Sequence, residues 1–195
     1  MKKIQLLTFF VLIGLLPYKG LCTILHVPVS YSSIQTGINA SASGDTVLVD
    51  PGTYYEHLNL NAKNIVLCSW YLTTGNSSYP STTIIDGSSV GRVITINQGE
   101  NSSCRIVGFT IQHGNSSSET DPDGGGIFML DASPQILNCI IQYNYAPTDG
   151  GGLCIRGLNS EAKALKCTII NNTSGGAGGG VLMNDCNPNA ELINC

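Results

Sequence analysis

Apolar and polar residues alternate through the second half of the chain, and the alternation recurs. A glycine triplet, an apolar stretch and a second stretch around a cysteine occur three times, with triplets starting at Gly124, Gly150 and Gly178. The period is therefore 26 and then 28 residues. Alternation with a period of two predicts strands that bury one face. Recurrence of such units at this spacing predicts a solenoid.

Equivalent residues of the repeats align in columns. The stretches after the triplets predict two buried columns: Ile127, Leu153 and Val181, and Met129, Ile155 and Met183. Around the cysteines we expect single strands with three inward positions: Leu137, Cys139 and Ile141, then Leu165, Cys167 and Ile169, then Ile193 and Cys195. An earlier stretch with Val107, Phe109 and Ile111 fits the same frame. Because their side chains run parallel and their number is odd, we expect the three cysteines to be free, buried thiols.

These repeats resemble those of the right-handed parallel β-helix proteins, the pectin-lyase-like superfamily. The glycine triplets with the later Asn144 and Asn172 also resemble the repeats of bacterial polymorphic outer-membrane proteins. The resemblance covers residues 24–195 and implies an all-β fold, a right-handed parallel β-helix solenoid. A leucine-rich repeat is the rival solenoid, but its helical segment does not suit the glycine-rich stretches.

The first residues have the features of a signal peptide. Lys2 and Lys3 precede an apolar run from Ile4 to Leu16, and small residues before Thr23 suit cleavage. We therefore divide the chain into a signal peptide, residues 1–22, and one β-helix domain, residues 23–195. This predicts a protein that is secreted or held at the outer cell surface, with no membrane span after removal of the signal.

A short amphipathic helix is predicted at the start of the domain, within residues 31–40. Ser32 or Ser33 is its expected N-cap, and Ile34 and Ile38 share one face. The surrounding stretch resembles the N-terminal cap of many β-helix proteins, which covers the open end of the first coil. The third repeat stops at Cys195, midway along a strand. We therefore expect a domain truncated at its C-terminal end that self-associates end to end when expressed alone.

The charge of the chain bears on its partners. Only 11% of residues are charged and the formal net charge is −4, which argues against a nucleic-acid partner. Asparagine, serine, threonine and glycine suit stacked strands better than repeated charges, which repel across each rung. A polysaccharide or another surface ligand is the partner that the composition and the resemblance favour.

Three aspartates are candidates for a metal site. Asp123 and Asp149 each precede a glycine triplet, so they are expected on neighbouring coils, and Asp121 lies in the long loop between them and Ile111. Adjacent carboxylates repel unless a cation or proton lies between them. The pattern loosely resembles the calcium-assisted polysaccharide lyases, which makes Ca2+ the one cofactor to consider. The alternative is ordinary turn chemistry, because Asp commonly precedes Gly in turns.

A candidate binding face comes from residues that alternate with the buried columns. Phe128, Cys154 and Leu182 form an apolar column that should point outward, and Arg156 follows on the same strand as Cys154. An outward apolar stripe predicts a binding face made by Phe128, Arg156 and Leu182. The alternative is that the chain's own long loop, residues 114–123, covers the stripe.

No catalytic residues are assigned from the sequence, and whether the chain is an enzyme stays open. The opening stretch resembles that of pectin methylesterases, but the aspartate motifs of that family are missing. His26, His57 and His113 show no spacing typical of a triad or a zinc site. We expect a non-catalytic adhesin-like or carbohydrate-binding module. The alternative is a polysaccharide lyase or glycoside hydrolase of the pectin-lyase-like superfamily.

Overall fold

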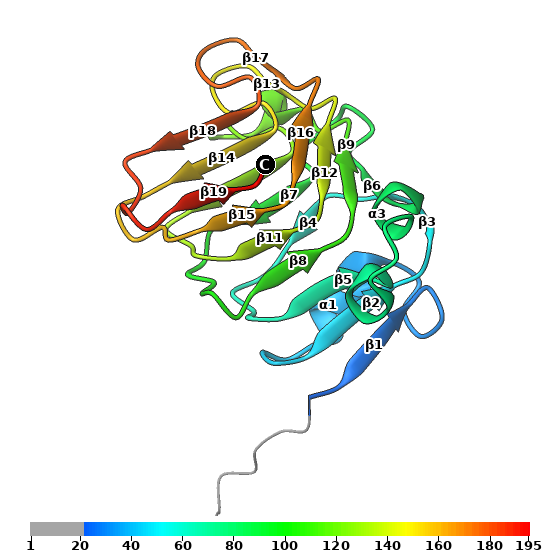
Figure 1. Cartoon of the computed structure of the whole chain (residues 1–195). Coiled ribbons are helices and arrows are strands. Elements are labelled where there is room, and N and C mark those ends of the chain that lie inside the picture. The colour runs from blue at the N-terminus through cyan, green and yellow to red at the C-terminus, as the bar shows by residue number, and fades with distance from the viewer. Residues whose placement is uncertain (1–21) are drawn as a thin grey trace, which may run out of the picture.

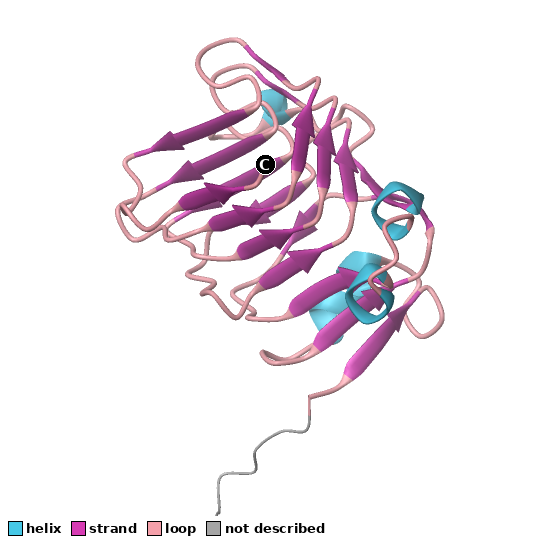
Figure 2. Ribbon diagram, viewed as in Figure 1, coloured by secondary structure: helices cyan, strands magenta, loops and turns pink. Residues whose placement is uncertain are grey.

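The structure is a computed structural model that describes residues 22–195. Strands make up 36% and helices 10% of it, so this part of the chain is all-β. Three parallel sheets stack their strands along one axis in a solenoid-like arrangement (Figure 2). The predicted signal peptide lies outside the described residues, except for Cys22. None of the helices in residues 22–195 is long and apolar enough to cross a membrane.

The strands fall into three large sheets and one small pair. Sheet 1 contains, in order, β1 (Ile24–Val27), β2 (Thr46–Val49), β5 (Val66–Ser69), β8 (Arg105–Val107), β11 (Gln135–Leu137), β15 (Lys163–Leu165) and β19 (Glu191–Ile193). Sheet 2 contains β3 (Gly52–Tyr55), β6 (Thr83–Asp86), β9 (Thr110–Gln112), β12 (Ile140–Gln142) and β16 (Thr168–Ile170). Sheet 3 contains β4 (Leu58–Asn59), β7 (Ile94–Ile96), β10 (Ile127–Leu130), β14 (Leu153–Arg156) and β18 (Val181–Asn184). The small pair is β13 (Tyr145–Ala146) and β17 (Thr173–Ser174).

Consecutive strands of the chain mostly belong to different sheets. The partner of a strand within its sheet therefore comes from the next or the previous coil, as the colours of Figure 1 show. The register confirms the predicted columns after the triplets, since Ile127 pairs with Leu153 and Leu153 with Val181. Ile127, Met129, Leu153 and Ile155 are fully buried in the single large core.

The predicted strand around each cysteine is wrong in one respect. The chain forms two strands, β11 and β12, separated by Asn138, which has a φ of 52° in the left-handed region. This corner reverses the alternation, so Ile136 points into the core while Leu137 is only half-buried. A left-handed residue turns the chain, whereas an alternating pattern assumes one continuous strand. The pattern therefore does not predict this corner.

The cysteines after these corners behave as expected in two of three repeats. Cys139 and Cys167 are buried with free thiols, whereas Cys195 is exposed. The Cys139 thiol beside it and burial both raise the pKa of Cys167. Each thiol points at a backbone carbonyl of the preceding coil, for example Cys167 Sγ at Ile136 O, 3.5 Å away.

The predicted helix covers the start of the stack. Helix α1 (Ile34–Ala40) begins after Ser33, whose side chain forms a reciprocal capping box with Thr36. The carboxylate of Glu56 accepts hydrogen bonds at 2.8 Å from the first two helical amides, those of Ile34 and Gln35. Ile34 and Ile38 are fully buried. The helix therefore closes the first coil with an apolar face, as the pattern predicted.

Two more short helices, α2 (Tyr71–Thr74) and α3 (Tyr79–Thr82), lie in one insertion between β5 and β6. A 3-10 helix, η1 (Ser116–Ser118), lies in the long loop before β10. Helices α1, α2 and α3 lie around the first coils, and the coils of the glycine repeats carry none (Figure 2). The insertion and the loop position the surfaces described next.

Candidate functional site

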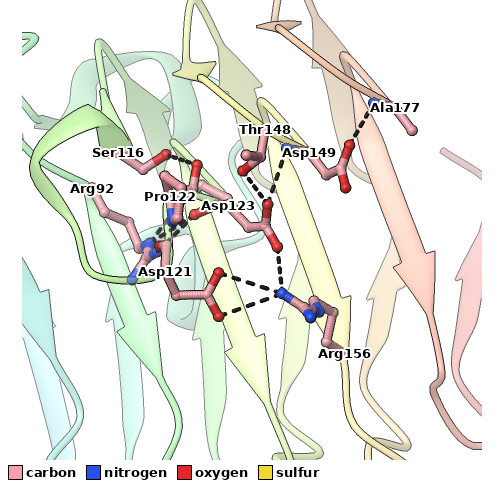
Figure 3. A network of polar contacts seen from close by, with 10 residues as sticks. Arg92, Ser116, Asp121, Pro122, Asp123, Thr148, Asp149, Arg156 and Ala177 are labelled. Atoms are coloured by element: carbon pink, nitrogen blue, oxygen red, sulfur yellow. Dashed lines mark hydrogen bonds and ion pairs between the residues drawn. The ribbon is translucent and has the colours of Figure 1, made fainter.

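The residues singled out in the sequence meet where the long loop crosses sheet 3. Loop residues Asp121 and Asp123, strand residue Arg156 and the turn residue Asp149 lie in one network of polar contacts (Figure 3). Arg92, which the sequence did not indicate, belongs to the same network. The network joins three successive coils.

Arg92 holds the loop against the sheet. Its guanidinium is buried and donates to the carbonyl oxygens of Asp121 at 2.5 Å, Asp123 at 2.7 Å and Gly124 at 3.1 Å. The guanidinium carbon lies 4.2 Å from the centre of the Phe128 ring, a cation–π contact. Burial lowers the pKa of Arg92, and the neighbouring carboxylates of Glu119 and Asp121 oppose this, so Arg92 stays charged.

Arg156 binds the two loop carboxylates from the other side. Its NH1 donates to Asp123 Oδ2 at 2.6 Å and lies 3.4 Å from Asp121 Oδ1. Figure 3 shows one guanidinium nitrogen of Arg156 facing both carboxylates. The Asp123 side chain is almost fully buried, whereas Asp121 and Arg156 are partly exposed. Asp123 is therefore neutralised by a cation of the chain itself.

The aspartates before the glycine triplets have a repeated structural role. Asp123 Oδ1 accepts from the hydroxyl of Thr148 and, at 3.0 Å, from the amide of Asp149. One coil on, Asp149 Oδ1 accepts from the amide of Ala177 at 2.5 Å. Each aspartate thus binds the backbone of the next coil, 26 or 28 residues further along the chain. Within residues 22–195 no three His, Cys, Asp or Glu side chains are grouped so as to hold a metal ion.

The glycine triplets follow from the same turn. Gly124, Gly150 and Gly178 have φ values of 61°, 63° and 64°, where a side chain is strained. A Cβ on Gly125 would collide with the carbonyl oxygen of Tyr145 on the next coil. The triplet therefore lets successive coils approach closely. This close approach explains why the triplet recurs in the three repeats of the chain.

The predicted apolar stripe is mostly covered. Phe128 is 2% exposed and Cys154 is fully buried, because Arg92 and the long loop lie over them. Burial raises the pKa of Cys154 to about 12. Leu182 on the next strand is half-buried. Phe128 is thus not available at the surface, and of the predicted binding face only Arg156 and Leu182 keep some exposure.

A second polar cluster lies on sheet 2 and centres on Asp86. Its Oδ2 lies 2.8 Å from His113 Nδ1, and its Oδ1 accepts from the amide of Ser88 at 2.8 Å. Burial raises the pKa of Asp86, but hydrogen bonds from Gln112, Ser88 and His113 outweigh it, so the pKa falls below the usual 3.8. Since the ionised carboxylate only accepts, His113 Nδ1 carries the proton and donates it to Asp86. In the neutral tautomer with the proton on Nδ1, Nε2 of the half-exposed ring is the acceptor.

A chain of amides continues from Asp86 along the sheet. Gln112 Nε2 donates to Asp86 Oδ2 at 2.8 Å, and Gln142 Nε2 donates to Gln112 Oε1 at 2.9 Å. These three residues are direct partners in the register of β6, β9 and β12. Their side chains therefore stack outward one coil at a time, about 4.8 Å apart.

Two exposed tyrosines border this row. Tyr55 pairs with Asp86 in the register and is 71% exposed. Tyr143, 52% exposed, lies beside His113 with ring centroids 6.1 Å apart. We call the six residues the glutamine face: Tyr55, Asp86, Gln112, His113, Gln142 and Tyr143. No pocket is present in the part of the chain that the structure describes, so this face is open rather than recessed.

The glutamine face was not predicted, although the alternation of residues around the cysteines contains a signal for it. Gln112 and Gln142 directly follow Ile111 and Ile141, two residues of a predicted column. The positions that follow these isoleucines face outward, and comparing them between successive coils would have aligned the two glutamines. Asp86 was harder to find, because β6 directly follows the insertion with α2 and α3 and lies outside the glycine repeats.

Comparison of the chain with known protein families, with curated proteins and with solved structures finds no match.

Proposed function

We propose that this chain is a secreted or surface-exposed right-handed parallel β-helix of the pectin-lyase-like type, and that it binds carbohydrate without catalysis through the glutamine face. The observation that carries the proposal is the row of Asp86, Gln112 and Gln142 bordered by Tyr55 and Tyr143. Amide and carboxylate groups offer the donors and acceptors that sugar hydroxyls need. Exposed tyrosine rings offer a flat apolar surface with a polar tip.

The repeat along the stack suits an extended ligand. One outward side chain per coil gives a row of contacts spaced by a single rung of the sheet. A linear polysaccharide lying along this row would meet a hydrogen-bonding group at each coil. Tyr55 at one end of the row and Tyr143 at its side would then pack against the faces of the sugar rings.

A polysaccharide array followed by calorimetry tests this proposal. Gln142→Ala and Tyr143→Ala should each weaken binding of the captured polysaccharide by roughly tenfold, the effect of about 1.4 kcal/mol. Gln135→Ala is the matched control, because Gln135 is also an outward glutamine but lies on sheet 1. Equal affinity of all three variants, or no captured polysaccharide, would contradict the proposal.

The paired Asp86 and His113 support a second candidate, a polysaccharide lyase. The oriented imidazole has its Nε2 free to remove a proton next to a sugar carboxylate. The adjacent C–O bond would break to form a C=C bond, and the imidazolium would return the proton to the departing oxygen. Ultraviolet absorbance of an unsaturated product from polygalacturonate, lost in His113→Ala, would favour this candidate over simple binding.

A further inference from the structure

An apolar row runs along the outer surface of sheet 1, on the opposite side of its strands from the core. The register aligns, from β2 to β15, Leu48, Cys68, Val107, Leu137 and Leu165. Leu48, Cys68 and Val107 form a small apolar cluster separate from the main core. The row is therefore a second apolar feature, outside the solenoid.

The chain covers only the first part of this row. Trp70 and Tyr71, at the start of the insertion, pack on Leu48, Cys68 and Val107, which are 3% exposed or less. Trp70 Nε1 donates to Asp50 Oδ1 at 2.7 Å, which holds the indole in place. A short helical segment with two adjacent aromatic residues thus serves as the cover.

The cover stops because of one backbone position. Tyr71 lies against Gly108, where a Cβ would come within 2.6 Å of the Tyr71 Cβ. In the next two coils this position is occupied by Asn138 and Lys166, which have the same left-handed backbone. Both residues carry a Cβ, and at Gly108 a Cβ would collide with Tyr71. Leu137 and Leu165 consequently stay half-exposed.

Basic residues flank the uncovered part of the row. Arg105 and Lys163 lie in the neighbouring outward column, and Lys166 follows Leu165 on the other side. Lys163 pairs with Glu191 at 2.8 Å. Among the lysine and arginine side chains of residues 22–195, Lys63, Arg92, Arg156 and Lys163 have hydrogen-bond or ion-pair partners, whereas Arg105 and Lys166 make no hydrogen bond or ion pair. The row is thus locally positive on a chain of net charge −4.

We propose that the uncovered row on sheet 1 docks an acidic protein segment that carries aromatic or large aliphatic anchors. The anchors pack on Leu137 and Leu165 as Trp70 and Tyr71 pack on the earlier part of the row. The acidic side chains of the partner pair with Arg105 and Lys166. Charge complementarity of this kind speeds association and selects against basic partners. The inference concerns a different sheet from the glutamine face and does not depend on carbohydrate binding.

Selection from a displayed library of random peptides on the immobilised full chain tests the proposal. We expect enrichment of acidic peptides with aromatic or leucine residues, whose affinity falls as salt is added. Lys166→Glu should weaken the synthesised peptides at least tenfold, and Leu165→Asp should abolish binding. Gln142→Ala on the glutamine face should leave the affinity unchanged. Because the Lys166 side chain is exposed, Lys166→Glu decides the test even if Leu165→Asp does not fold.

Three results would overturn the proposal. The first is no enrichment, or enrichment of peptides without acidic residues. The second is full binding to Lys166→Glu, which would place the peptide elsewhere. The third is a dimer of the full chain in sedimentation that Leu165→Asp converts to a monomer, since the occupant of the row would then be a second copy.

Discussion

The first and last coils of this stack are built from the same parallel strands but treat their surfaces differently. At the first end α1 buries Ile34 and Ile38 completely, and Trp70 and Tyr71 at the start of α2 cover the first part of the outer row of sheet 1. In the last coil Leu192, which pairs with the buried Ala164, is 41% exposed. The comparison shows that the strands supply a uniform scaffold, while inserted helices and loops decide which parts of it meet water.

The largest expected effect comes from placing a charge at each end. Ile38→Asp buries a carboxylate with no partner in the cap, so we expect a loss of more than about 4 kcal/mol in the free energy of unfolding, or no folding. Leu192→Asp should cost less than about 1 kcal/mol, because this side chain is 41% exposed. Urea denaturation of both variants checks this. Similar losses would show that the two ends do not differ as described.

Two asparagines at equivalent positions of successive coils should also differ in their contribution to stability, by less than the two ends do. Asn144 is 1% exposed, accepts from the amide of Gly114 and donates to Ile111 O and Asn172 Oδ1. Asn144→Ala leaves buried backbone groups unpaired, so we expect a loss of about 2–3 kcal/mol. Asn172→Ala in the more exposed neighbouring coil should cost less. Thermal unfolding compares them, and an equal drop in Tm would contradict the contrast.

Acid should weaken the early coils through Asp86. Its pKa is lower in the folded chain than the usual 3.8, so its contribution to stability is present above about pH 4. That contribution is lost as the pH falls through the lower, folded pKa. Asp86→Asn should be less stable than the original chain at neutral pH, and this difference should shrink in acid.

Asp185→Asn is the matched control on the last coil. Asp185 is exposed and has a left-handed backbone that asparagine also adopts, so the substitution should leave the free energy of unfolding nearly unchanged. Urea denaturation at several pH values below 5 provides the measurement. A stability difference for Asp86→Asn that stays constant across this range would show that Asp86 does not act through its charge.

The smallest effect is expected at the corners of sheet 1. Lys166 has a φ of 54°, and the equivalent positions carry Gly108 and Asn138. Asparagine tolerates this region better than lysine, so Lys166→Asn should stabilise the fold by a few tenths of a kcal/mol. A rise of about 1 °C in Tm would agree. Lys163→Asn, in a regular strand, should bring no such gain.

Much of the fold followed from alternation alone. The columns through Ile127 and Met129 and the helix after Ser33 were predicted where they occur, because apolar period and capping residues are local signals. The corner at Asn138 was not predicted. A single left-handed residue there exchanges the inward and outward positions of the preceding strand, β11, relative to a continuous strand. Leu137 was therefore predicted inside, although the structure places it on the outer row.

Local signals of the chain specify the repeating strands and the N-terminal cap. The contacts of Arg92 and the loop with Phe128, of Asp86 with His113, and of Tyr71 with Gly108 depend instead on how the coils stack. The physical reason is that strand formation and capping depend on neighbours in the sequence. Covering and pairing depend on side chains 25 or more residues apart, which only the register of successive coils brings together.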